Sequence, residues 1–167
     1  RNNGGGLVAD YIVEILGRRQ LWGVAARDGI DMVSPAGALY GPKAMLVNRH
    51  AGSGGDALPW MFRALGLGPL VGTRTWGGLV GIWDYPELVD GGMVTAPRGG
   101  LYAKNGKWEV ENVGVAPDHA VEVTPKDFAA GRDPQLEKGV ELLLAELAKG
   151  VAPKPQRPPF PDYQVTP

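Results

Sequence analysis

Apolar residues recur at helical spacing in two parts of the chain. Between residues 7 and 16 they fall on one face of a helix, and Gly17 marks its end. Further along, Asp133 suits a helix cap, Pro134 suits the first helical position and Gly150 marks a stop. The apolar stripe expected for this C-terminal helix consists of Leu136, Val140, Leu143, Leu144 and Leu147. The pattern therefore predicts two amphipathic helices.

The middle of the chain has short apolar runs bounded by turn residues. Residues 44–48 and 69–73 form two such runs, and residues 57–65 between them have helical character. A strand, a helix and a strand at this spacing predict a βαβ unit with a buried parallel sheet. Residues 21–26 predict a further strand, whereas the glycines and prolines of residues 28–42 predict a loop.

The second half of the chain is rich in turns. Residues 79–110 alternate short apolar stretches with Asp-Gly, Gly-Gly and Asn-Gly pairs, which predicts additional antiparallel hairpins. Residues 121–123 predict one more short strand. The chain holds 26 glycines, a content that favours a turn-rich α/β protein over a helix bundle. Prolines dominate residues 151–167, so we expect an extended tail behind a folded region at residues 1–150.

Composition narrows the class of protein. With 167 residues, 44% of them apolar, the chain can form one domain with a sizeable core. The net charge of -1 gives no electrostatic basis for binding nucleic acid or an anionic membrane. The absence of cysteine excludes disulfides, thiolate zinc sites and cysteine nucleophiles, and it fits a reducing cytoplasm. No apolar run is long enough to span a bilayer. Since the sequence opens in a glycine loop without an initiator Met, we expect it to be cut from a longer polypeptide.

One serine stands where a buried strand turns sharply into a helix. Ser53 has glycine on both sides, at Gly52 and at Gly54. Such a turn exposes the hydroxyl, and the helix N-terminus places partial positive charge beside it. This is the logic of a nucleophile elbow, although the sequence is not Gly-x-Ser-x-Gly. Ser53 and Asp56 also form a Ser-x-x-Asp capping pattern. Because serine caps outnumber serine nucleophiles, the local pattern alone favours the cap.

Several further blocks occur in a fixed order around this serine. They are Asn3-Gly4-Gly5-Gly6, Tyr40-Gly41-Pro42-Lys43, Ala51 to Asp56, Gly72 to Gly78 and Val110 to Asp118. Taken together, the blocks resemble the C-terminal catalytic region of tricorn proteases, relatives of the tail-specific serine proteases. The resemblance implies a Clp protease/crotonase-like β-sheet core, serine peptidase activity, no metal and no cofactor. It also implies a cytoplasmic homo-oligomer that acts on peptide substrates.

The resemblance assigns a role to four residues. It implies that Ser53 is the nucleophile, that the amides of Gly6 and Gly54 form the oxyanion hole, and that Glu111 supports the catalytic histidine. Two departures stand out. Gly54 replaces an acid that is frequent in the family, which is tolerable because only the backbone amide is needed. Residues 23–26 are apolar where the family can carry an acid, which argues against a preference for basic residues before the cut.

The general base is the largest departure. In the family it lies upstream of the Asn-Gly-Gly-Gly block, so we expect it on an upstream part of the same polypeptide that this chain lacks. His50 and His119 are the only histidines, and we expect neither to act as the base. The isolated chain should then be nearly inactive. Two alternatives stay open: a non-catalytic module that binds peptide or drives assembly, and an acyl-CoA hydratase-like enzyme, for which no acid pair or CoA pocket can be located.

Overall fold

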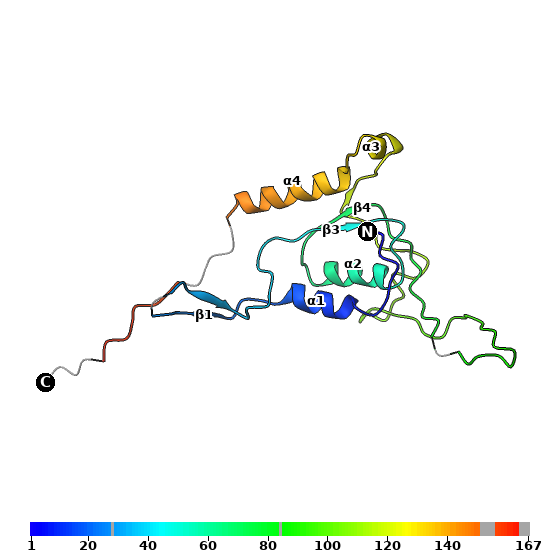
Figure 1. Ribbon diagram of the computed structural model, residues 1–167, viewed down its shortest axis with the longest axis horizontal. Helices are drawn as coiled ribbons and strands as arrows, with labels where there is room; N and C mark the ends of the chain where they lie inside the picture. Colours follow the sequence, from blue (N-terminus) through cyan, green and yellow to red (C-terminus); the bar gives the residue numbers. More distant parts are fainter. Residues whose placement is uncertain (28, 84, 151–155, 164–167) are drawn as a thin grey trace.

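The computed structural model describes residues 1–27, 29–83, 85–150 and 156–163. Four helices and five short strands are present among them. In chain order they are α1 (Ala9–Gly17), β1 (Trp22–Val24), β2 (Met32–Ser34), β3 (Met45–Val47), α2 (Gly54–Ala64), β4 (Leu70–Gly72), β5 (His119–Ala120), α3 (Pro125–Ala129) and α4 (Pro134–Ala148). Together they form an α/β fold, and β3, α2 and β4 make the expected βαβ unit (Figure 1).

The central sheet has three parallel strands in the order β3-β4-β5. Met45 is in register with Leu70, and Val71 is in register with His119. Because side chains alternate between the two faces of a strand, Val47 faces α2 while Leu46 lies against Gly139 of α4. The sheet is therefore covered by α2 on one face and by α4 on the other (Figure 1).

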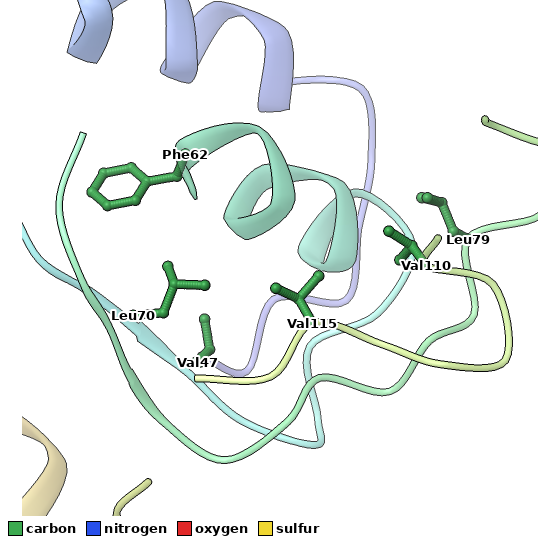
Figure 2. Packing of buried hydrophobic residues seen from close by; sticks show 6 residues of the cluster. All are labelled: Val47, Phe62, Leu70, Leu79, Val110 and Val115. Atoms are coloured by element: carbon green, nitrogen blue, oxygen red, sulfur yellow. The ribbon is translucent and has the colours of Figure 1, made fainter. Parts of the chain in front are cut away.

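The core lies between α2 and the sheet. Figure 2 shows its buried members, Val47, Phe62, Leu70, Leu79, Val110 and Val115. Phe62 lies near the end of α2, whereas Leu79 and Val110 lie close together beside its start. Helix α1 packs along the outside of α2, with only Ala9 and Val13 buried. The start of α2 is thus held by core contacts from segments far away in the sequence.

Two sequence predictions about the connecting segments need correction. Residues 28–42 are not all loop, because Met32–Ser34 forms β2 and pairs antiparallel with β1. The described residues between 79 and 110 form no strands and only one antiparallel bridge, between Gly81 and Gly99. Tight turns do form there, as in the bond from the Leu88 amide to the Gly92 carbonyl. Strands do not follow because the neighbouring side chains, such as the fully exposed Val89, have no core to pack against.

The C-terminal helix forms as predicted, but its buried face is different. Asp133 caps it by accepting a hydrogen bond from the amide of Leu136, as expected. The residues buried against the sheet are Gln135 and Gly139, while four of the five stripe positions, all except Leu143, are exposed. Helix α4 approaches the sheet closely because Gly139 has no side chain and its α-carbon can lie near Leu46.

Smaller differences concern the last strand and the tail. Strand β5 begins at His119, two residues before the predicted strand, and α3 follows from a Thr124–Asp127 capping box that the predictions omit. Arg157 of the predicted tail bonds to the carbonyl of Ala26 and pairs with Asp31, so the tail contacts the segment between β1 and β2 before it runs outward (Figure 1). The predicted boundary at residues 150 and 151 meets positions outside the described residues and stays a prediction. No helix in the described ranges has the length and apolar character needed to cross a membrane.

Candidate active site

Ser53 occupies a strained turn between β3 and α2. Its backbone has φ 55° and ψ -120°, a conformation that costs a non-glycine residue energy. Its side chain makes no capping hydrogen bond, although Ser53 stands at the N-cap position of α2. The capping interpretation favoured by the local pattern is therefore wrong. The Ser53 hydroxyl is therefore available for a role other than capping. It lies at a helix N-terminus, where the helix dipole places partial positive charge.

The N-terminal glycine loop lies directly against this turn. Asn3 joins the two segments, because its carbonyl accepts the amide of Gly52 at 3.0 Å. A Cβ on Gly5 would lie 2.7 Å from the Cβ of Ser53 and 3.0 Å from its Oγ. A Cβ on Gly54 would lie 2.2 Å from the carbonyl oxygen of Gly6. The loop can come this close only because these positions are glycine, and Gly5 and Gly6 also have positive φ angles of 108° and 109°.

Two backbone amides near Ser53 have no partner within the described part of the chain. They belong to Gly6 and Gly54, which lie side by side. The other early amides of α2 are bonded, since Gly55 donates to Gly52 and Asp56 donates to Ser53. A pair of unpaired N–H groups beside a serine hydroxyl can bind an oxyanion.

Ser53, Gly6 and Gly54 all line one cleft of about 1030 Å³. Most of its wall is apolar and comes from residues 6–14, which include the start of α1, and from residues 79–83; it includes Leu7, Tyr11, Leu79, Ile82 and Trp83. Two carboxylates, those of Asp10 and Glu14, lie on the same wall, and no basic residue lines the cleft among the described residues. The cleft is large enough for an extended peptide.

Glu111 lies behind the wall of this cleft. Its Oε2 accepts hydrogen bonds from the amides of Leu79 at 2.6 Å and Val80 at 2.7 Å, two residues that line the cleft. A turn places it there, in which the amides of Val113 and Gly114 both bond to the carbonyl of Val110. The structure thus brings Glu111 to the segment that faces Ser53, although 58 residues (111 − 53) separate them.

A second carboxylate holds the preceding part of the same segment. Asp56 is completely buried, and its two oxygens accept the amides of Gly77 at 2.8 Å and Gly78 at 3.1 Å. Four successive amides, from Gly77 to Val80, are thereby bonded to two carboxylates. This arrangement fixes one wall of the cleft relative to the first turn of α2.

Neither histidine lies at the cleft. His50 is exposed in the turn before Ser53 and lines a separate pocket with Asn48 and Arg49. His119 starts β5, where it is in register with Val71. Within the described residues, no group of three or more His, Cys, Asp or Glu side chains is arranged to hold a metal ion.

Comparison with known proteins assigns this chain to a protein family. The model of peptidase family S41 matches residues 1–121. The chain belongs to peptidase family S41. It is 39% identical over 158 residues to the Tricorn protease of Thermoplasma acidophilum, covering 95% of this chain and 15% of that protein. It is also 41% identical over 155 residues to Tricorn protease homolog 1 of Streptomyces coelicolor, covering 93% of this chain and 14% of the relative.

The solved structures agree with the family assignment. The crystal structure of the tricorn protease superposes with a TM-score of 0.84 at 38% identity, covering 89% of this chain and 14% of that one. The expected Clp protease/crotonase-like α/β fold is confirmed by this match. This S41 chain spans about 15% of the length of the curated relatives it matches, so it corresponds to a small part of each.

The S41 chain brings together three of the four residues singled out from its sequence. Ser53, Gly6 and Gly54 meet at the cleft, and Glu111 lies behind its wall. Sequence reasoning missed Gly5, where a Cβ would clash with Ser53, and it assigned Asp56 no role beyond the capping pattern. The signal for Asp56 was an acidic residue in the first turn after the serine, together with a Gly77-Gly78 pair whose amides needed an acceptor.

Proposed function

We propose that this chain carries the nucleophile and the oxyanion hole of a serine peptidase that hydrolyses peptide bonds. The observation that carries the proposal is the strained Ser53, whose hydroxyl makes no cap and stands beside two unpaired amides in a cleft. Backbone strain persists only where the surrounding structure enforces it, and it gathers at functional sites. Membership of family S41 supports the same chemistry.

In the proposed reaction, the Oγ of Ser53 attacks the carbonyl carbon of the scissile peptide bond and gives its proton to a histidine. The amides of Gly6 and Gly54 donate hydrogen bonds to the oxyanion that forms. Each such donor lowers the barrier by about 3 kcal/mol. The C–N bond then breaks, the leaving amine takes the proton from the histidine, and an acyl-enzyme on Ser53 remains for water to hydrolyse.

The histidine of this scheme is not one of the two in the chain. Neither His50 nor His119 lines the cleft, so the proposed base lies on an upstream part of the same polypeptide. The Oε2 of Glu111 is occupied by two backbone amides, whereas no described residue donates to its Oε1. That oxygen can accept the bond that orients the histidine, which is the role we propose for Glu111.

The exposed apolar surface supports further contacts outside these residues. Trp22 and Val24 of β1 and Met32 of β2, away from the cleft, share one face of the hairpin and are 69%, 44% and 59% exposed. Exposed apolar groups of this size usually mark an interface. We propose that the upstream part of the polypeptide and further copies of the protein cover them, and that the assembly is a cytoplasmic homo-oligomer. Peptides are the proposed substrates. The apolar residues 23–26 continue to argue against selection of a basic residue before the cut.

Replacement of the two serines of the chain tests the proposal. In the full-length protein, Ser53→Ala should abolish cleavage of short peptides, because no other serine or threonine of the described residues lines the cleft. Ser34→Ala is the matched control, since Ser34 lies on β2 and does not line the cleft, and this variant should keep the wild-type rate. A Ser53→Ala protein that cleaves at the wild-type rate would exclude the proposal and favour a peptide-binding or assembly module.

A further inference from the structure

We infer that Asp56 is a positioning residue that fixes the Ser53 turn, an inference that rests on the proposed function. Asp56 does not touch the cleft and cannot contact a substrate there. It acts through Gly77 and Gly78, whose amides its carboxylate accepts. The carbonyl of Gly78 in turn accepts the amide of Ser53 at 2.8 Å. The carboxylate of Asp56 is therefore linked to the amide of Ser53 through a single intermediate segment, Gly77-Gly78.

The hydrogen bonds differ from those of an ordinary helix start. In a capping box, the acid at the third helical position accepts the amide of the N-cap residue. Here the acid at that position is Asp56, but the amide of Ser53 goes to Gly78. The Asp56 carboxylate therefore accepts no hydrogen bond from the Ser53 amide and binds the amides of Gly77 and Gly78 instead. This arrangement ties α2 to another segment, which the stability of the helix alone does not require.

The segment that Asp56 holds runs beside the turn over three residues. The amide of Trp76 bonds to the carbonyl of Ala51 at 2.8 Å, and the amide of Ser53 bonds to the carbonyl of Gly78. Residues 51–53 are thus held against residues 76–78 by backbone bonds. The carboxylate of Asp56 adds two bonds to the amides of residues 77 and 78. Together these bonds oppose relaxation of the positive φ of Ser53.

Burial makes the carboxylate hard to replace. Asp56 is 0% exposed, so water cannot take over its role as acceptor without opening the core. Asp56→Asn keeps one acceptor oxygen but points an NH₂ group at an amide that also donates. Asp56→Ala removes both acceptors. Loss of this support would let Ser53 move relative to the amides of Gly6 and Gly54.

The test compares these two variants with a buried control in the full-length protein. The control is Gln135→Leu on α4, a residue that does not line the cleft, and it removes the hydrogen bonds of a buried side chain with Val121 and Arg1. The measurements are kcat and KM for a short peptide, the rate at which a phosphonate probe labels Ser53, and the thermal midpoint. We expect Asp56→Ala to lower kcat roughly 100-fold, because a displacement of about 1 Å costs that much. Asp56→Asn should lie between Asp56→Ala and wild type.

KM should stay within about twofold of wild type in both variants, because the apolar cleft wall that binds the peptide is left in place. The labelling rate should fall with kcat. Gln135→Leu should lower the thermal midpoint and leave kcat and labelling unchanged. If the Asp56 variants lose thermal stability while folded protein keeps wild-type kcat and labelling rate, the inference is overturned. If wild-type protein is not labelled at Ser53, the proposed function itself fails, which is a separate result.

A measurement on the wild type covers the case in which the Asp56 variants do not fold. Hydrogen exchange should show peptides covering residues 53–57 and 76–80 equally protected, because the two segments open together. Rapid exchange of residues 76–80 beside a protected residue 53–57 segment would overturn the inference.

Discussion

A methyl group on Gly5 would lie 2.7 Å from the Cβ of Ser53, closer than real Cβ contacts allow. Gly5 also has a φ of 108°, where a side chain is strained. The two residues are 48 positions apart (53 − 5) and touch only because the glycine loop crosses the start of α2. Gly5 thereby sets the distance between the serine hydroxyl and the neighbouring amide of Gly6.

Gly5→Ala is expected to lower kcat/KM for a peptide roughly 100-fold, because the added methyl displaces either Ser53 or the loop. Gly4→Ala is the matched control, since a Cβ there has no heavy atom within 4 Å. Steady-state kinetics on the full-length protein measure both. Equal losses in the two variants, or no loss in either, would show that close packing at Gly5 has no part in the site.

Two substitutions of Glu111 separate its contribution to stability from its contribution to catalysis. Glu111→Gln keeps a carbonyl oxygen for the amides of Leu79 and Val80 but removes the charge, so it should cost only about 1 kcal/mol of stability. Its kcat should still fall roughly 100-fold, because the charge no longer supports the protonated histidine. Glu111→Ala leaves both amides without an acceptor and should cost about 3 kcal/mol.

Urea unfolding and peptide kinetics on both variants distinguish the two contributions. A Glu111→Gln protein with wild-type kcat would limit Glu111 to supporting the cleft wall, and its proposed action on the histidine would be wrong.

Asp133 makes the stability of the folded chain depend on pH in the acid range. Its hydrogen bond with the Arg1 guanidinium lowers the pKa of Asp133 from 3.8 to about 2. The unfolded chain then binds more protons than the folded chain between these two values, so stability rises with pH across this window. The contribution should be complete above about pH 4 and should disappear as the pH falls through about 2.

Asp133→Asn tests this dependence while keeping a good helix cap. The variant should unfold at a lower urea concentration than wild type at pH 7, and the difference should shrink towards zero near pH 2. A difference that stays constant from pH 7 to pH 2 would mean that the ion pair with Arg1 does not cause it.

The sequence predicted the elements whose local signals agreed with their surroundings. Asp133 and Pro134 mark the start of α4 without help from the rest of the fold, and β3, α2 and β4 follow from apolar runs between turns. The prediction failed where tertiary contacts decide. Gln135 and Gly139, rather than the leucine stripe, face the sheet, because close approach of the helix depends on a missing side chain.

At the candidate site, too, local signals were predictable and long-range contacts were not. The pattern around Ser53 could not distinguish a cap from an exposed hydroxyl, since both use a serine before a helix. The backbone angle of Ser53 and the capture of its amide by Gly78 are long-range features. The role of Asp56 was equally hidden, because its partners lie 21 and 22 residues away.

The most direct test of the account is covalent labelling of full-length protein with a serine-directed phosphonate, followed by peptide mass spectrometry. We expect one modified residue in the segment around residues 51–57, namely Ser53, together with loss of peptide cleavage in proportion to labelling. Full inhibition with the label on another residue, or no label on protein that cleaves peptides, would contradict it.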